Sequence, residues 1–280
     1  MSLRDKLPKG LKKTLRHGVT TTERFFDKIK FGSKRLWRIF FKDNRSGYSF
    51  AILCVKKTVY ADLAIDNINS LHYLNPNHIV YIYCDNVCFD YLTKKNRLWY
   101  KDGVVLKNSY AVAERPWQYY KIETIIRASQ NDQILIDADS VWHNDLVIDQ
   151  NKVTILALAY KIKDLKNETL LMKEVFGKID WQEFDHCVSA FVSIPKKFMT
   201  RKIEDDLRHF NDTIFTNSLD FIENPGDRES LRRLSEELAV NLALQTNLPP
   251  EMITTLKKSG DPGDKKTLQS LYYGCLNGMD

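Results

Sequence analysis

A short apolar run that ends in two aspartates constrains this chain more than any other feature of its sequence. Ile134, Leu135 and Ile136 form the pattern of a buried strand, and Asp137 and Asp139 follow it, one residue apart. Because residues i and i+2 of an extended segment point to the same side, the two carboxylates can converge on one point. Ligands bind at the carboxyl ends of strands in parallel sheets. The pattern therefore predicts two oxygen donors for Mg²⁺ or Mn²⁺ beside nucleotide phosphates, although aspartates also serve as plain turn and capping residues.

The segments around this run alternate between strand and helix patterns, which predicts an α/β domain with a mostly parallel sheet. Apolar strands are predicted at 48–55, 78–83, 104–106, 134–139, 153–160 and 187–195. Near the C-terminus, one long helix is predicted with Leu231, Leu234, Leu238 and Leu242 on a single face. The first strand–helix–strand unit has no Gly-rich turn, and this argues against a dinucleotide-binding fold or a P-loop.

Size and composition favour one large domain over residues 47–280 with an appendage over residues 1–46. The chain has 280 residues, of which 43% are hydrophobic, so it can bury a sizeable core. It has no apolar run of about 18 residues and no secretory signal at its start, which predicts a cytoplasmic protein without a transmembrane helix. The five cysteines are scattered and odd in number, which favours buried, reduced thiols over disulfides or a zinc site.

The basic charge of the chain belongs to its N-terminal arm. Residues 1–47 contain 14 Lys and Arg against 4 Asp and Glu, a net charge of +10, so the rest, with 28 against 32, carries −4. Within 22–42, aromatic and aliphatic residues alternate with cationic ones, which suits a helix lying peripherally on an anionic membrane surface. The alternative is an apolar face packed on the domain. Nucleic-acid binding is not expected, because no motif for it accompanies the charge.

Several segments in a fixed order resemble the GT-A-type glycosyltransferases, which use nucleotide sugars. The resemblance covers about 48–245. It is carried by the strand–helix–strand unit at 48–85, the Trp117-x-x-x-Lys121 helix, the Asp137-Ala138-Asp139 motif, the Ser189 to Pro195 strand and the Glu236-Glu237-Leu238-Ala239-Val240-Asn241 segment. It implies a GT-A-like mixed, mostly parallel sheet flanked by helices. It also implies transfer of a sugar from a UDP- or GDP-linked donor to a glycan, lipid or protein acceptor, with Mn²⁺ or Mg²⁺.

The resemblance also implies roles for residues on the donor side of the site. Asp139 would hold the metal ion, and Asp137 would contact the metal ion or the ribose. Lys121, on the same helix face as Trp117, would reach the diphosphate or the donor sugar. The residues Val55, Lys56 and Asp85 would line the nucleotide pocket.

On the acceptor side, Glu236 or Glu237 would face the acceptor hydroxyl. In an inverting enzyme, one of them would be the general base. Many metal-dependent relatives add a histidine ligand near the C-terminus, whereas the last histidine here is His209. A third ligand would then be Asp261, Asp264 or water, or metal binding would be weakened.

Each of these residues also has an ordinary structural interpretation. Lys121 could lie across Trp117 as a simple packing pair. Glu236 and Glu237 could complement a helix N-terminus that Ser235 caps. The remaining candidates have plain roles too, since Asp85 suits a turn and His143 and His186 are expected at the surface.

Two alternative functions stay open at this point. Asp137-Ala138-Asp139-Ser140-Val141 also resembles the nucleophile motif of haloacid-dehalogenase-like phosphatases, with Ser193 and the acidic cluster at 260–264 as further matches. In that family the nucleophile strand opens the domain, whereas here the strands at 48–55 and 78–83 already precede it and no apolar strand is predicted before Gly260. The second alternative is a catalytically inactive, membrane-docked GT-A-fold protein.

Overall fold

The structure is a computed structural model that describes residues 46–95, 103–140, 142, 146–161, 173, 175–177, 184–217 and 224–257. The predicted arm, apart from its last residue, lies outside the described residues, and so do His143, Asp261 and Asp264. The helices in the described part of the chain are too short or too polar to cross a bilayer. The four cysteines within it, Cys54, Cys84, Cys88 and Cys187, are buried and form no disulfide.

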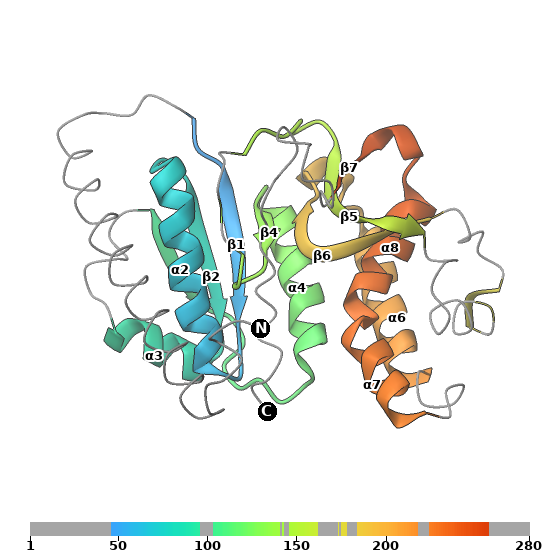
Figure 1. Ribbon diagram of the computed structural model, residues 1–280, viewed down its shortest axis with the longest axis horizontal. Coiled ribbons are helices and arrows are strands. Elements are labelled where there is room, and N and C mark those ends of the chain that lie inside the picture. Colours follow the sequence, from blue (N-terminus) through green and yellow to red (C-terminus); the bar gives the residue numbers. More distant parts are fainter. Residues whose placement is uncertain are drawn as a thin grey trace, which may run out of the picture. The chain divides into compact units, whose positions relative to one another are not determined.

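Seven strands in the described part of the chain form one mixed sheet (Figure 1). Their bounds are β1 (Ser49–Cys54), β2 (Ile79–Cys84), β3 (Val104–Asn108), β4 (Ile134–Ile136), β5 (Val153–Lys161), β6 (Asp185–Ser193) and β7 (Ile253–Lys257). They lie in the order β3-β2-β1-β4-β6-β5-β7. Strand β6 is antiparallel to both of its neighbours, and the other neighbouring pairs are parallel. The predicted GT-A-like sheet, mixed and mostly parallel, is confirmed.

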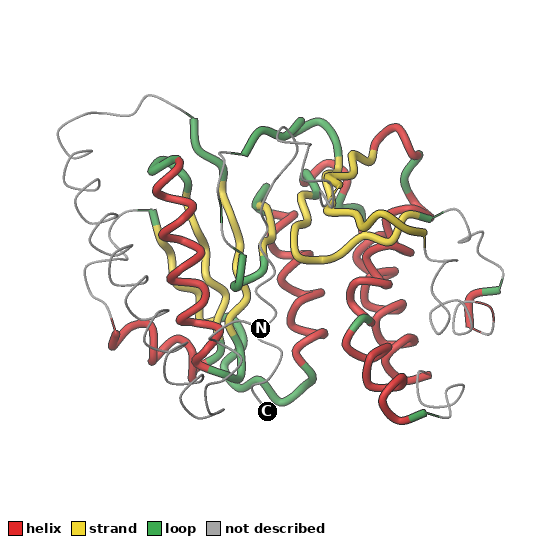
Figure 2. Tube along the Cα trace, in the orientation of Figure 1, coloured by secondary structure: helices red, strands yellow, loops and turns green. Residues whose placement is uncertain are grey.

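Helices lie against this sheet (Figure 2), and the buried apolar residues form two separate core clusters. Their bounds are α2 (Thr58–Leu74), α3 (Asn86–Lys95), α4 (Trp117–Gln130), α6 (Arg201–Asn217), α7 (Pro225–Arg233), α8 (Ser235–Asn247) and the short 3₁₀ turns η4 (Lys196–Phe198) and η5 (Pro250–Met252). Alternate residues of β1 point to opposite faces, as the pleat requires. Ala51 belongs to the core that α4, α6 and α8 share, whereas Phe50 and Ile52 belong to the core under α2.

The prediction of one long C-terminal helix was wrong, because two helices meet at Leu234. The Leu234 backbone, at φ −92° and ψ 2°, closes α7 and opens α8. Its N–H donates to the carbonyls of Ser230 and Leu231, which ends the first helix. Leu231 of α7 and Leu238 and Leu242 of α8 are all buried in the same core cluster. The break places Ser235, Glu236 and Glu237 in the first turn of a new helix.

Two elements in the described part of the chain were not predicted from the sequence. Helix α6 buries Ile203, Leu207 and Ile214 at helical spacing against the core that α4 and α8 share. Strand β7 pairs in parallel with β5 over Ile253–Lys257, so a short strand of mixed polar and apolar residues, not an apolar one, precedes Gly260. The acidic cluster of the phosphatase alternative therefore follows a strand, but not the apolar strand whose absence weighed against it.

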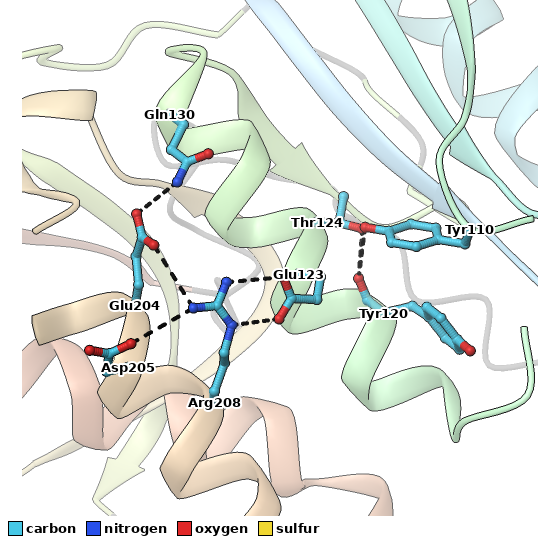
Figure 3. A network of polar contacts seen from close by, with 8 residues as sticks. All are labelled: Tyr110, Tyr120, Glu123, Thr124, Gln130, Glu204, Asp205 and Arg208. Atoms are coloured by element: carbon cyan, nitrogen blue, oxygen red, sulfur yellow. Dashed lines mark hydrogen bonds and ion pairs between the residues drawn. The ribbon is translucent and has the colours of Figure 1, made fainter. Parts of the chain in front are cut away.

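A polar network fixes α4 to α6 on the surface (Figure 3). Arg208 donates from Nε and Nη2 to the two carboxylate oxygens of Glu123, at 2.6 and 3.1 Å. One helical turn away along α6, Glu204 accepts a 2.7 Å hydrogen bond from Gln130. Since α4 also carries Trp117 and Lys121, this network helps to hold the helix that delivers them to the site.

Candidate active site

The predicted donor-side and acceptor-side residues come from elements that meet near the end of β4. Strands β1, β2 and β4 are parallel, so their carboxyl ends lie at one edge of the sheet. Lys121 near the start of α4 contacts Asp137, which directly follows β4, and Glu236 in the first turn of α8 approaches Lys121. The chain thus gathers charged side chains from three elements that are far apart in sequence.

The centre of this group is a buried lysine between two carboxylates. Lys121 Nζ lies 2.7 Å from Asp137 Oδ1 and 3.7 Å from Glu236 Oε1. The Lys121 side chain is 7% exposed and that of Glu236 is 1% exposed, whereas that of Asp137 is 26% exposed. Ser189 donates its hydroxyl to Glu236 Oε1 at 3.2 Å, and Glu236 Oε2 has no hydrogen-bond partner among the described residues. Asp137 is therefore the member of the network that reaches solvent.

Burial and charge shift the ionisation of this network in opposite senses. Burial alone would lower the pKa of Lys121, but the carboxylates of Asp137 and Glu236 outweigh it and raise the pKa, so the lysine stays charged. Burial raises the pKa of Glu236, and Lys121 only partly offsets this. Burial and the neighbouring Glu236 raise the pKa of Glu237 as well. The two glutamates thus hold protons to higher pH than ordinary carboxyl groups do.

Asp139 completes the predicted carboxylate pair. Burial raises its pKa first, and the negative charge of Asp137 raises it further, while Lys121 lowers it. Two carboxylates thus share a single nearby lysine. Two neighbouring carboxylates beside a single lysine are suited to binding a cation.

The loop that carries Asp137 and Asp139 is pinned from behind by α2. Asn67, fully buried, donates from Nδ2 to the Asp137 carbonyl at 2.7 Å and accepts from the Trp142 indole Nε1–H at 2.9 Å. Ser70, one turn further along α2, accepts the Trp142 backbone N–H at 3.0 Å. Both ends of the aspartate loop are therefore anchored to one helix. Sequence reasoning missed Asn67 and Ser70, because polar residues on a helix do not reveal a partner about 70 positions away.

Strand β6 supplies the side of the site that faces α8. The Asp137 N–H donates to the Ala190 carbonyl at 3.0 Å, which places the adjacent Ser189 beside Glu236.

Asn241 accepts from the Cys187 N–H at 2.9 Å and donates to its carbonyl at 2.7 Å, so α8 is fastened to the edge of β6. Because these two hydrogen bonds fix Asn241 on β6, the number of residues between Glu236 and Asn241 determines where Glu236 lies.

His186 was expected at the surface, and this expectation was wrong. The residue lies in β6 and is buried, because β6 runs under α8. Its Nε2 is 3.8 Å from Glu237 Oε2. Burial lowers the pKa of His186 to about 4, so the imidazole is neutral at neutral pH and forms no ion pair with Glu237 there.

A purely structural role at the N-terminus of α8, as cap or as partner of the helix dipole, fits Glu237 but not Ser235 or Glu236. Ser235 does not cap the helix, because its hydroxyl donates to Asn211 Oδ1 at 2.9 Å instead. Glu236 is enclosed beside Lys121, so a role as a solvated dipole partner does not describe it. Glu237, with 15% of its side chain exposed, is the more accessible of the two glutamates.

The predicted nucleotide-pocket residues form a second group, at the ends of β1 and β2. Asp85 is buried, and its two carboxylate oxygens accept the Lys56 N–H at 2.6 Å and the Cys88 N–H at 2.9 Å. Lys56 has a left-handed backbone with φ 70°, which this bond helps to hold. Val55 is buried behind it. Asp85 is thus the turn residue of the ordinary interpretation, and it also shapes the turn that presents Lys56.

Trp117 lies at the border of the first group. Its side chain is 37% exposed, and Lys121 Nζ lies over the ring at 5.6 Å from the centroid. The expected packing pair is therefore present, and it coexists with the ion pair to Asp137. The next residue, Gln118, donates to the Arg232 carbonyl at 2.9 Å and so joins the start of α4 to the end of α7.

Comparisons with known proteins give a likeness in structure alone. No protein family description matches the sequence, and no curated protein matches it. The apo-form glycosyltransferase GlyE of Streptococcus pneumoniae TIGR4 has 11% identity and a TM-score of 0.39, with 68% of this chain and 43% of that chain covered. The chain thus spans less than half the length of GlyE.

Two further solved structures are covered over most of their length. The PaToxG glycosyltransferase has 10% identity and a TM-score of 0.39, with 82% of this chain and 80% of that chain covered. The mannosyltransferase PcManGT of Pyrobaculum calidifontis, solved with GDP-Man and Mn²⁺, has 10% identity and a TM-score of 0.32, with 81% and 83% covered. All three solved structures are glycosyltransferases. With TM-scores below 0.5, these likenesses do not by themselves assign a family or an activity to the chain.

Proposed function

We propose that this chain is a glycosyltransferase that moves a sugar from a nucleoside diphosphate donor to an acceptor hydroxyl. One observation carries the proposal: a buried lysine and an aspartate pair meet where the parallel strand β4 ends. Lys121 is held 2.7 Å from Asp137, and Asp139 lies two positions further along the chain. This is the position in an α/β sheet where phosphate-bearing ligands bind.

The aspartate pair fits a hard divalent cation. Its donors are carboxylate oxygens, which Mg²⁺ and Mn²⁺ prefer, and its nearby counter-charge among the described residues is Lys121. The described residues contain no group of three or more His, Cys, Asp or Glu side chains that could hold a metal ion. Asp137 and Asp139 would then bind the cation together with phosphate oxygens or water, as Mg²⁺ sites often do. When bound, the cation would neutralise charge on the leaving diphosphate.

Lys121 contributes a second positive charge at the same point. Breaking the bond between sugar and diphosphate develops negative charge on the leaving phosphate, and a fixed cation stabilises that charge where it appears. The ammonium group is pre-positioned, because it lies over the Trp117 ring and is held by Asp137. Trp117, partly exposed next to it, offers a ring face to the donor or acceptor sugar.

Among the two glutamates, we assign the acceptor-side role to Glu237. A general base needs access to the acceptor proton and a pKa near the working pH. Glu237 is the more exposed of the pair, and its pKa is raised. Glu236 is enclosed between Lys121 and Ser189, which suits support of the lysine rather than contact with an acceptor. In a retaining reaction no dedicated base is required, and Glu237 would then only orient the acceptor.

The nucleotide is assigned to the turn after β1. Asp85 uses both carboxylate oxygens to hold backbone N–H groups, so it would shape the pocket without contacting the base. Lys56 is exposed at that turn, as is Lys57, and Lys56 would contact the UDP or GDP moiety. Val55 would form the apolar wall.

The acceptor is assigned by class only, as a glycan or a lipid-linked or protein-linked glycan under assembly. The basic aromatic segment 22–42 suggests that the chain works at an anionic membrane surface. Deleting residues 1–46 is then expected to abolish co-sedimentation with vesicles that contain phosphatidylserine or phosphatidylglycerol. Equal sedimentation of the full chain and the truncated chain would contradict this part of the proposal.

A donor screen tests the proposed reaction. The full chain is incubated with UDP- and GDP-linked sugars in Mn²⁺ or Mg²⁺, and release of the nucleoside diphosphate is measured with and without acceptor extracts. We expect metal-dependent release from one donor, abolished in Asp139→Asn and kept in Asp205→Asn, an exposed control on α6. Release of inorganic phosphate from simple phosphomonoesters, lost in Asp137→Asn, would instead favour the phosphatase alternative.

A further inference from the structure

Lys121, which the proposed reaction uses, already forms an ion pair with Asp137, one of the two proposed metal ligands. Lys121 Nζ contacts Asp137 Oδ1 at 2.7 Å, which is a full charge-assisted hydrogen bond. A divalent cation at Asp137 and Asp139 would therefore arrive within a few ångströms of a buried ammonium group. Like charges repel strongly at such distances where water is largely excluded. The lysine and the cation thus compete for the same carboxylate.

Glu236 is a second possible ion-pair partner for Lys121. Its Oε1 is 3.7 Å from Lys121 Nζ, about 1 Å too far for a hydrogen bond. Glu236 is held in place by the Ser189 hydroxyl, and its Oε2 is buried without a hydrogen-bond partner among the described residues. A buried carboxylate with an unused oxygen beside an ammonium group is an ion pair that is not fully hydrogen-bonded. A small rotation of the lysine stem along the Trp117 ring would complete it.

We propose that Lys121 and the divalent cation exchange places at Asp137, with Glu236 as the positioning residue that receives the displaced lysine. Without metal, Lys121 is the counter-charge of Asp137. With metal, the ammonium group pairs with Glu236 and remains beside the diphosphate as a second positive charge. This inference rests on the metal site of the proposed function and deepens it, because it makes metal affinity depend on a buried residue of α8 that does not bind the metal.

Mn²⁺ binding to the nucleotide-free full chain tests the exchange without any activity. Free Mn²⁺ is titrated by electron paramagnetic resonance against wild type, Lys121→Met, Glu236→Gln and the double variant. Lys196→Met, an exposed lysine in η4, is the matched control. We expect Lys121→Met to bind Mn²⁺ about tenfold more tightly, since a competing charge is gone. Glu236→Gln should bind several-fold more weakly, and the control should stay within about twofold.

The double variant separates an effect through Lys121 from direct attraction between Glu236 and the metal ion. If Glu236 acts by receiving the lysine, Glu236→Gln should have no effect in the Lys121→Met background. An equal weakening in both backgrounds would overturn the exchange, and so would unchanged or weaker Mn²⁺ binding in Lys121→Met. Lys121→Gln provides a second neutral variant, and cooperative thermal unfolding of each variant verifies the fold.

Two outcomes distinguish this inference from the proposed function. Wild-type Mn²⁺ binding that depends on Asp139 but not on Lys121 overturns the exchange and leaves the metal site intact. No Mn²⁺ binding by wild type or any variant overturns the exchange and the metal-dependent reaction together.

Discussion

Asn67 holds Asp137 by a 2.7 Å hydrogen bond from its side-chain amide to the aspartate's backbone carbonyl, across 70 positions of sequence. The same amide accepts the Trp142 indole N–H, so one fully buried side chain anchors both ends of the aspartate loop. The direction in which Asp137 and Asp139 point thus depends on a residue that would not touch any ligand.

Asn67→Asp should therefore loosen the loop while keeping nearly the same shape. The new carboxylate can still accept the Trp142 N–H, but it cannot donate to the Asp137 carbonyl and leaves charge in a buried site. We expect the free energy of unfolding to fall by about 2–3 kcal/mol and Mn²⁺ affinity to fall with it. Chemical denaturation and Mn²⁺ titration measure the two effects. Unfolding equal to that of wild type would show that the bond does not anchor the loop.

The turn at Lys56 predicts that glycine substitutions at two neighbouring residues, Lys56 and Lys57, will affect stability differently. Lys56 has φ 70°, a region that favours glycine, whereas Lys57 has φ −127°. Lys56→Gly should leave stability unchanged or raise it by up to about 1 kcal/mol, and Lys57→Gly should lower it by roughly 0.5–1 kcal/mol. Thermal unfolding of both variants checks this difference. A lower stability for Lys56→Gly than for Lys57→Gly would contradict the strained turn.

The pH dependence of stability should carry the signature of the two buried glutamates. Their pKa values are raised in the folded state, so the native chain binds more protons than the unfolded chain, and stability falls as pH rises from about 4.5 towards the raised values. His186, with a pKa lowered to about 4, opposes this slope below its ordinary value of 6.5. Lys121, whose pKa is raised, loses its stabilising charge only in the alkaline range.

Glu236→Gln removes one of the two buried glutamates, and with it a charge that raises the pKa of Glu237. The variant should gain stability relative to wild type as pH rises from 5 to 8, which melting temperatures across that range will show. If the general base is Glu237, kcat/KM should rise with pH over the same range, since the base must be ionised. If the melting temperatures of wild type and Glu236→Gln change with pH in the same way, a raised pKa at Glu236 is contradicted.

The network between α4 and α6 should matter little to stability. Arg208 and Glu123 form a bidentate pair, but their side chains are 43% and 36% exposed. We expect Arg208→Ala to lower the free energy of unfolding by no more than about 1 kcal/mol and to leave nucleotide binding unchanged. Denaturation in low and high salt measures this. A loss of nucleotide affinity would mean that α6 controls the position of Lys121.

Local patterns in the sequence predicted most of the sheet, because apolar runs mark its strands whatever their partners. Strand β4 and its two aspartates follow directly from the run Ile134–Ile136. Helix α6 was missed although its apolar residues Ile203, Leu207 and Ile214 have helical spacing, a signal that was present and unused. Strand β7 is short and mixed in character, and only its pairing with β5 makes it a strand.

The predicted site divides in the same way. Trp117, Lys121, Asp137 and the two glutamates lie on elements that the pattern foresaw, and the structure brings Lys121, Asp137 and Glu236 within ion-pair distance. The clamp from Asn67 and the burial of His186 depend on tertiary contacts that no local pattern encodes. The break at Leu234, which decides how the glutamates face the site, was hidden because its leucines keep a helical spacing across it.

Calorimetric titration of the purified chain with UDP and GDP, with and without Mn²⁺, tests the central claim most directly. The nucleotide-sugar site predicts that one nucleotide binds in the presence of Mn²⁺, and that Asp139→Asn weakens this binding at least about tenfold while Asp205→Asn does not, because only Asp139 would contact the metal ion. If neither nucleotide binds with or without Mn²⁺, or if Asp139→Asn binds as tightly as wild type, the glycosyltransferase proposal is contradicted.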